Sequence, residues 1–361
     1  MIKGDILKII HCADIHLGSK INTTMAAISK AIKTDVRNSF MRMCEYARGE
    51  DIHIILLSGD VFDSDVPLKK DKDNFYQTIR NYSDIDFLYL KGNHDLNTNY
   101  DDIPQNLKCF NDTWTKYAYD NVVIAGLEMT GSNESSLYTS LNLNENNLNI
   151  VMLHGMVSDT VGLNNIKLSL LRNKNIDYLA LGHVHTYKEY KIDSRGAACY
   201  AGCLEGRGFD ETGPKGFIVL DITNKINYDF HPFSLRVIHD EEIDIFSSKT
   251  VNDVINIINQ RLKPNDNDIY KLTLKGEVSP ELDLTEMDII SYYQNVYFMK
   301  VYLDTTIIID YAKYENDISL KGEFVRTILN DLKLDDKQKK EIISLGLKVL
   351  DGREVDLYEN N

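Results

Sequence analysis

Three common features are missing from this 361-residue sequence: a cysteine framework, a long apolar run and an excess of basic residues. Its 5 cysteines are scattered and form no Cys-x-x-Cys pair, which excludes a disulfide scaffold and a zinc knuckle. We expect reduced thiols, as in cytoplasmic proteins. The N-terminus lacks the apolar run of a signal peptide, and no stretch approaches the roughly 20 residues of a membrane span. A soluble, cytoplasmic protein without membrane association is therefore expected.

The charge balance limits how this chain can bind nucleic acid. It has 40 Lys and Arg residues against 55 Asp and Glu residues, a formal net charge of −15. Nucleic-acid binding therefore cannot rest on a globally basic surface. The composition is otherwise globular, with 43% hydrophobic and 26% charged residues, and the length suggests about two domains.

The first two-thirds of the sequence alternate apolar segments with helical ones. A helix is predicted over residues 25–48, where Ile32, Val36 and Phe40 recur at helical spacing, and a polar helix at about 70–81. Strands are predicted for the short apolar runs at 7–12, 53–57, 87–90, 122–125, 149–153 and 178–181. This alternation predicts an α/β fold, a layered domain with a mostly buried sheet.

The pattern changes after about residue 195. Gly-rich turns lead into a strand at 216–221, and strands and helices then alternate from 235 to 303, which predicts a small second α/β domain. Two amphipathic helices come next, at 318–331 and 335–349. The predicted organisation is a first domain over 1–235, a second over 236–311 and a helical tail over 312–361.

Polar clusters come directly after the apolar strands of the first domain. Five of the nine histidines lie in these clusters, which are Asp14-Ile15-His16, Gly59-Asp60, Gly92-Asn93-His94-Asp95, His154-Gly155 and Gly182-His183-Val184-His185. The carboxyl ends of strands form the ligand-binding edge of open α/β sheets, so we expect the clusters to meet there.

The residue types in these clusters suit a site for two metal ions. Imidazole, carboxylate and amide oxygen are ligands for Mn, Fe or Zn. At a strand end, Asp14 and His16 can point to the same side and chelate one ion, and the same holds for His183 and His185. The carboxylate of Asp60 can bridge two ions. Each cluster alone is weak, since such residues also occur in surface turns, but the ordered combination predicts a metal site.

The ordered series Asp-x-His, Gly-Asp, Gly-Asn-His-Asp, His-Gly and Gly-His-x-His resembles that of the calcineurin-like metallophosphoesterases. The resemblance covers residues 8–185 and implies a β-sandwich flanked by helices. The opening His11-Cys12-Ala13-Asp14-Ile15-His16-Leu17-Gly18 and the segment 58–63 are similar to the DNA-repair exonuclease branch, the SbcD-type or meiotic-recombination nuclease subunits. The segment 200–216 resembles the YhaO-like exonucleases. In that branch a capping domain and an ATPase-binding segment come after the nuclease domain, as the residues after 235 suggest here.

The resemblance also implies roles for single residues. Asp14, His16 and His185 would hold the first metal ion, Asn93, His154 and His183 the second, and Asp60 would bridge them. His94 would orient the phosphate or protonate the leaving oxygen, with Asp95 as its candidate orienter. Asp63 lies where some members have a catalytic histidine, so its catalytic role stays open. Four basic residues, with solvated surface as the alternative, are candidates for DNA contact: Lys20, Arg195, Arg207 and Lys215.

The function implied is that of a two-metal DNA exo- or endonuclease subunit for double-strand-break repair. It would use two divalent ions, with Mn expected and Fe, Zn or Mg as alternatives, and work as a homodimer with an SMC-like, SbcC-type ATPase on DNA. One alternative is a phosphatase or phosphodiesterase for small phosphoesters, because fold does not define substrate. The other is a non-catalytic tether of DNA ends.

Overall fold

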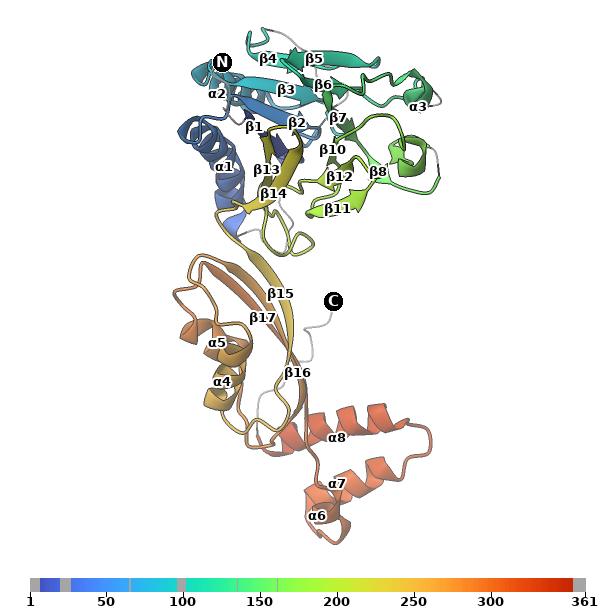
Figure 1. The fold of residues 1–361 in the computed structure, drawn as a ribbon. Coiled ribbons are helices and arrows are strands. Elements are labelled where there is room, and N and C mark those ends of the chain that lie inside the picture. The colour runs from blue at the N-terminus through green and yellow to red at the C-terminus, as the bar shows by residue number, and fades with distance from the viewer. Residues whose placement is uncertain are drawn as a thin grey trace. The chain divides into compact units, whose positions relative to one another are not determined.

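The computed structural model describes residues 7–19, 27–64, 66–95, 102–134, 136–160 and 162–352. The chain divides into two compact units, residues 1–238 and 239–361. Figure 1 traces the chain from blue at the N-terminus to red at the C-terminus. Among the helices of the described ranges, none is long and apolar enough to cross a membrane.

The first unit is built on two six-stranded sheets. The first sheet has the strand order β14-β13-β1-β2-β3-β4. β1 to β4 run parallel to one another, whereas β13 is antiparallel to β1 and to β14. The strands are β1 (Leu7–Cys12), β2 (Ile54–Ser58), β3 (Asp86–Leu90), β4 (Leu107–Cys109), β13 (Gly216–Ile222) and β14 (Ile226–Pro232).

The second sheet has the order β11-β12-β10-β7-β6-β5. Its four central strands, β12, β10, β7 and β6, are parallel, and both edge strands are antiparallel to their neighbours. The strands are β5 (Thr115–Tyr119), β6 (Val122–Gly126), β7 (Leu148–His154), β10 (Tyr178–Gly182), β11 (Lys188–Lys191) and β12 (Ala197–Tyr200). A short pair, β8 (Met156–Val157) and β9 (Asn165–Ile166), comes after β7.

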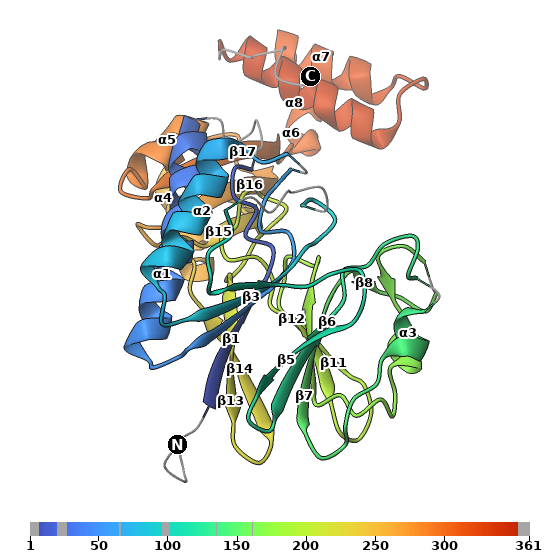
Figure 2. The ribbon, with the colours of Figure 1, turned by 90° about the horizontal axis from the view of Figure 1, so that it is seen from above.

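The two sheets pack face to face, and the strand period of two distributes their side chains between cores. Ile9 and Leu56 belong to the core between the sheets, whereas Ile10 and Ile55 pack with Phe40 of α1. α1 (Ser29–Gly49) and α2 (Lys69–Asn81) cover the outer face of the first sheet (Figure 2). α3 (Leu137–Ser140) and a 3-10 turn (Leu168–Leu170) cover the second sheet. The first unit is thus a β-sandwich flanked by helices, which confirms the predicted fold class.

The helix predicted over 25–48 is confirmed as α1. Its apolar face, with Ile32, Val36, Phe40 and Met43, is buried against the first sheet. Residues 25 and 26 lie outside the described residues. Apolar residues at this spacing form the stripe that a sheet-covering helix needs.

The second unit begins with a three-stranded sheet of order β15-β16-β17. β15 (Ile238–Asp244), β16 (Ile269–Val278) and β17 (Phe298–Ile307) share a core with α4 (Val251–Arg261) and α5 (Glu286–Tyr292). Both helices begin with a capping box, in which a threonine and an aspartate three residues on satisfy each other's backbone amides. These strands and helices alternate as the sequence pattern predicts, and a separate domain over 236–311 stays a prediction.

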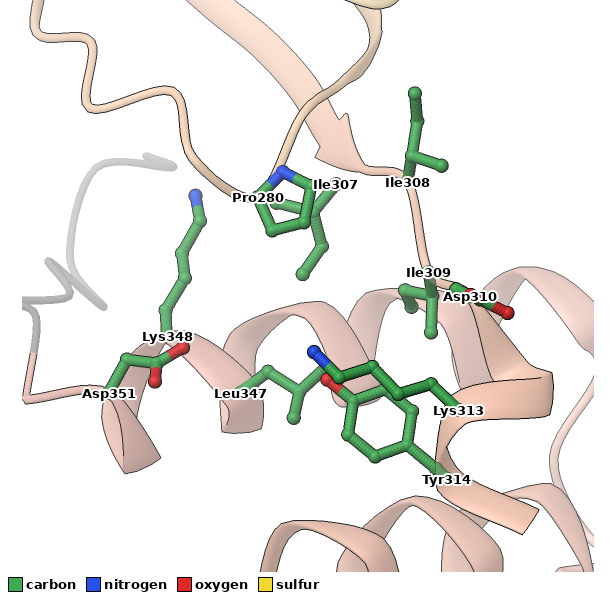
Figure 3. A pocket seen from close by; sticks show the side chains of 10 residues that line it. All are labelled: Pro280, Ile307, Ile308, Ile309, Asp310, Lys313, Tyr314, Leu347, Lys348 and Asp351. Atoms are coloured by element: carbon green, nitrogen blue, oxygen red, sulfur yellow. The ribbon is translucent and has the colours of Figure 1, made fainter. Parts of the chain in front are cut away.

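Three helices close the second unit: α6 (Tyr311–Glu315), α7 (Leu320–Leu329) and α8 (Asp336–Leu350). A small core joins them to the end of β17 through Ile307, Val325, Ile343 and Leu347. Beside this core lies a hollow with apolar walls and charged groups at its rim, drawn in Figure 3. The prediction of α7 and α8 is confirmed, α6 is additional, and a domain boundary at residue 311 stays a prediction.

Candidate metal centre

The polar clusters predicted from the sequence meet at the carboxyl ends of parallel strands from both sheets. β1, β2 and β3 of the first sheet lead into the first three clusters, and β7 and β10 of the second sheet lead into the other two. The structure gathers all seven predicted metal ligands there: Asp14, His16, Asp60, Asn93, His154, His183 and His185.

Four of these residues hold a strained backbone, His183 with φ of 104° and three others with a common value. Asp14, His16 and Asp60 all have φ of 51°, a left-handed conformation that costs a non-glycine residue about 1–3 kcal/mol. Backbone hydrogen bonds between the two loops hold it: the Asp14 amide donates to Gly59 O at 3.0 Å, and the His16 amide to Asp60 O at 3.0 Å. Such strain gathers at functional sites, because the surrounding structure must maintain it.

The first ligand group consists of Asp14, His16 and His185, whose ligand atoms lie within 4.8 Å of one another. The Nδ1 atoms of the two rings face carboxylates, His16 towards Asp63 at 3.0 Å and His185 towards Glu211 at 2.7 Å. A carboxylate accepts, so these partners place the proton on each Nδ1 and leave a lone pair on each Nε2. The Nη2 atom of Arg207 also lies 3.2 Å from His185 Nδ1. The two Nε2 atoms nevertheless lie 3.2 Å apart. Two facing lone pairs at this distance fit a shared cation.

The second ligand group consists of Asp60, His154 and His183, again with ligand atoms within 4.8 Å. His154 Nδ1 donates to Ser58 O at 2.9 Å, so Nε2 is the ring nitrogen that could bind a cation. That Nε2 faces Asp60 Oδ2 at 3.3 Å and Asn93 Oδ1 at 3.1 Å. Asn93 Oδ1 also lies 3.0 Å from His183 Nδ1. These acceptors converge on one point, as they would around a second cation.

Asp60 lies between the two groups. Its Oδ2 atom is 3.3 Å from His154 Nε2 in the second group and 3.8 Å from His16 Nε2 in the first. Its Oδ1 atom accepts from the His94 backbone amide at 2.9 Å, which orients the carboxylate. This is the arrangement expected of a bridging ligand.

Burial and close contacts shift the pKa values of several residues in the two ligand groups. Burial raises the pKa of Asp14 to about 6 and lowers the pKa of His16 to about 4. Although burial opposes a charged His154, its hydrogen bond to Asp60 raises the pKa of His154 to about 9. A proton on His154 thus supplies positive charge to the second group in the protein without ions. A bound cation would displace that proton, because metal ligands bind in their deprotonated form.

His94 is the exposed member of the centre. Its ring meets the ring of His16 edge to face, with centroids 5.1 Å apart. Its backbone amide is bound to Asp60, so the side chain stands beside the ligand groups and faces solvent. The predicted action of His94 on a bound phosphoester stays a prediction.

Asp95 has a different role from the one predicted. Its side chain is fully buried, and its carboxylate accepts from the amides of Val61 at 2.9 Å and Gly92 at 2.5 Å and from the Tyr89 hydroxyl at 2.5 Å. Burial raises the pKa of Asp95 to about 7. Its contacts join the loop after β2 to the loop after β3, so it holds the loops of Asp60 and Asn93 together instead of orienting His94.

Asp63, whose catalytic role the resemblance leaves open, acts through His16. Its Oδ1 atom faces His16 Nδ1 at 3.0 Å and accepts from Arg207 Nη1 at 3.2 Å. Although burial works in the opposite direction, the hydrogen bond with His16 lowers the pKa of Asp63. The carboxylate fixes which ring nitrogen of His16 carries the proton, and a catalytic role for Asp63 stays a prediction.

Two of the predicted DNA contacts lie inside the protein. Lys215 is 2% exposed, and its Nζ donates to His185 O at 2.9 Å. The guanidinium of Arg207 is bound by the carboxylates of Glu211 and Asp63. Neither cation stands at the surface, because Lys215 is enclosed and Arg207 is paired with two carboxylates, and a DNA contact by either stays a prediction.

The other two predicted DNA contacts lie elsewhere. Arg195 binds Asp177 at 2.8 Å and Glu145 O at 2.9 Å. Asp177 precedes β10, so Arg195 joins loops at the end of this strand opposite the metal centre. A DNA contact by Arg195 stays a prediction for that end of the sheet. Lys20 lies outside the described residues.

Glu211 is not among the residues predicted from the sequence, although it lies in the segment 200–216 that carries part of the resemblance. It is 7% exposed and binds both His185 and Arg207. The only local sign of a role for Glu211 is its position four residues after Arg207 in a Gly-rich segment. Nothing local indicates that both side chains turn inward.

Two glycines let the ligand loops approach one another. Gly59 has φ of +92°, and a Cβ there would lie 2.2 Å from His154 Nδ1. At Gly182 a Cβ would lie 1.9 Å from Ser58 O. Gly59 needs its conformation for a sharp turn, whereas Gly182 is needed for space between two strands of different sheets.

The fold and the centre define a metal-dependent phosphoesterase. Residues 7–187 match the calcineurin-like phosphoesterase family, and the chain belongs to this family. Members of the family use divalent metal ions, and the two ligand groups supply suitable donors. The family predicted from the motif series is confirmed.

Three curated relatives show which members of the family this chain is similar to. The chain is 23% identical over 395 aligned positions to the DNA double-strand break repair protein Mre11 of Saccharolobus solfataricus, covering 96% of this chain and 99% of that protein. It is 23% identical over 374 positions to a subunit of the nuclease SbcCD of Staphylococcus epidermidis, covering 90% and 92%. It is 28% identical over 251 positions to the metallophosphoesterase YhaO of Bacillus subtilis, but that match spans 62% of this chain and only 60% of YhaO.

Proposed function

We propose that the protein is a two-metal DNA nuclease, the exo- or endonuclease subunit of a complex that repairs DNA double-strand breaks. The observation that carries the proposal is the position of Asp60 Oδ2 between two groups of buried acceptors, 3.3 Å from His154 and 3.8 Å from His16. A pair of ions bridged by one carboxylate is the arrangement that phosphodiester hydrolysis uses.

The residues divide into ligands and substrate-facing groups. Asp14, His16 and His185 would hold one ion, and Asn93, His154 and His183 the other, with Asp60 between them. Bound divalent ions, with Mn²⁺ expected, would neutralise the phosphodiester charge and lower the pKa of a water molecule.

His94 completes the proposed chemistry. Its exposed ring beside His16 is placed to hydrogen-bond a phosphate oxygen or to give a proton to the leaving oxygen.

The second unit of the chain favours DNA over a small phosphoester as the substrate. The match to Mre11 extends over 96% of this chain and so includes the second unit. A minimal phosphatase does not need an added α/β domain and helix pair. The local charge of two dications would attract the DNA backbone in spite of the net charge of −15.

The helix pair α7 and α8 is the proposed docking site for an SMC-like ATPase of the SbcC type. Leu320 is 71% exposed, Val349 57% and Leu345 39%. Together with Phe324 and Ile342 they line a shallow apolar groove on the two helices. Such a groove fits the apolar stripe of an amphipathic helix or a coiled coil. A homodimer, which the resemblance implies, is part of the same proposal.

The test is hydrolysis of an end-labelled DNA duplex in Mn²⁺, run beside a generic phosphodiester and a generic phosphomonoester. We expect metal-dependent cleavage of the duplex that disappears in Asp60→Asn. Turnover of either small ester with intact DNA, in the presence of the ATPase as well as in its absence, would replace the nuclease by a small-molecule phosphoesterase. Loss of all three activities would favour a DNA-end tether.

A further inference from the structure

The two ligand groups of the metal centre are supported in different ways. In the second group, His154 is oriented by a backbone carbonyl, with Nδ1 2.9 Å from Ser58 O. In the first group, both histidines are oriented by side-chain carboxylates, Asp63 for His16 and Glu211 for His185. The support of the first group therefore depends on ionised side chains that must themselves be held in place.

Arg207 joins these two carboxylates. Its Nη1 atom donates to Asp63 Oδ1 at 3.2 Å, and its Nη2 atom to Glu211 Oε1 at 2.5 Å. Its Nε atom and its backbone amide donate to Glu211 Oε2 at 3.2 Å and 2.8 Å. The planar fork of a guanidinium can bind two carboxylates at once, which an ammonium cannot do with the same geometry.

Asp63, Arg207 and Glu211 form a largely buried network of charges, so the loss of any one of them is costly. Glu211 has 7% of its side chain exposed, Arg207 13% and Asp63 27%. Removal of one partner from a buried ion pair leaves an uncompensated charge, which is strongly unfavourable. Without Arg207, two carboxylates beside the same pair of imidazoles would repel each other. The guanidinium allows both to stay ionised as acceptors.

The consequence for the ligands is a fixed ring orientation. A carboxylate that accepts from Nδ1–H directs the lone pair of Nε2 towards the ion, and loss of such a partner typically weakens metal binding 10- to 100-fold. Lys215 adds a main-chain contact from the same segment, Nζ to His185 O at 2.9 Å. The segment from Arg207 to Lys215 thus contacts both the ring and the main chain of His185.

We propose that Arg207 and Glu211 are positioning residues for the first metal ion alone, acting through the imidazole rings of His185 and His16. This inference rests on the ligand set of the proposed function. The second ion is held by groups that this pair does not contact in the described residues. The affinity for the first ion therefore depends on the segment around Arg207, and the affinity for the second does not.

The test is a titration of the full-length, metal-free protein with Mn²⁺, in which free Mn²⁺ is measured by its electron paramagnetic resonance signal. We expect two ions to bind to the unmodified chain. In Glu211→Gln one of the two binding steps weakens 10- to 100-fold and the other is unchanged. Arg207→Lys, which retains the charge and loses the fork, weakens the same step.

Two double variants show which of the two ions is bound in the weakened step. In Asp14→Asn, which impairs the first group, Glu211→Gln has no further effect on the remaining step. In His154→Ala, which impairs the second group, Glu211→Gln weakens the step that remains. Equal weakening of both steps, or of neither, overturns the proposal.

Glu205→Gln is the matched control. Glu205 is a carboxylate of the same segment that is only 4% exposed, and it accepts from Ser39 and from the Leu235 amide, away from the ligands. Its loss should leave both binding steps unchanged. If Glu205→Gln weakens Mn²⁺ binding as much as Glu211→Gln does, the effect is one of general packing and the proposal is wrong. DNA is absent from this titration, so failure of the nuclease assay with intact Mn²⁺ binding leaves the present inference standing.

Discussion

His16 Nε2 and His185 Nε2 lie 3.2 Å apart although 169 positions separate the two residues in the chain. One comes after a strand of the first sheet, and the other comes after a strand of the second. The face-to-face packing of the two sheets therefore assembles the metal centre, since each of the two predicted ligand groups takes residues from both sheets. The carboxylates behind both rings direct the two lone pairs towards the same point.

The first prediction concerns the bridging carboxylate. Asp60→Asn should lower the rate of DNA cleavage in Mn²⁺ by more than about 100-fold. Loss of a residue that only supports a metal ligand typically costs 10- to 100-fold, and Asp60 is itself a predicted ligand. The amide retains an oxygen to accept from the His94 backbone, so the fold should survive. The measurement is cleavage of an end-labelled duplex, with the exposed Asp73→Asn as control. Full activity in Asp60→Asn would remove the bridging role.

The second prediction concerns the pH dependence of stability. Burial raises the pKa of Glu205 to about 7, above the value of about 4.3 for an unfolded chain. The folded state then binds more protons between these values, so this group makes stability fall as pH rises from about 4 to above 7.

Glu205→Gln removes this titration while it retains an oxygen that can accept from Ser39 and from the Leu235 amide. The melting temperature should therefore fall less between pH 5 and pH 8 in the variant than in the unmodified chain. The full shift corresponds to at most about 4 kcal/mol. Parallel pH profiles of the two proteins would contradict a raised pKa at Glu205.

The third prediction concerns the close approach of two strands. In Gly182→Ala the added Cβ would lie 1.9 Å from Ser58 O, so the strands or the loop must move. We expect a loss of about 1–3 kcal/mol, read as a lower melting temperature, together with weaker Mn²⁺ binding. Gly131→Ala adds the same methyl group where nothing lies within 4 Å and is the control. Equal melting temperatures for both variants would show that the site adapts without cost.

The fourth prediction concerns the helix pair. Leu345→Glu places a charge in the apolar groove on α7 and α8 and should abolish binding of an SMC-like ATPase coiled coil in calorimetry. Leu332→Glu makes the same change at a leucine that is 97% exposed and does not line the groove, and it should bind normally. Unchanged binding by Leu345→Glu would place the partner elsewhere.

The ligand set could be predicted from the sequence because each motif is local. Asp14 and His16, or His183 and His185, stand two positions apart after an apolar strand, and parallel strands in two sheets bring such ends together. The charged residues of the segment 205–215 could not be assigned in this way. Arg207 reads as an exposed cation in the sequence, but its partner Asp63 lies 144 positions away.

The sequence by itself determined the family, the α/β layering, the helix pair and the residues able to bind metal, since these depend on hydrophobic period and donor chemistry within short segments. Only the tertiary structure decided what the other charges do. Lys215 and Arg207 turn inward to the metal centre, and Asp95 joins two loops instead of orienting His94. The physical reason is that the role of a charge depends on its burial and on its partner, and both come from distant parts of the chain.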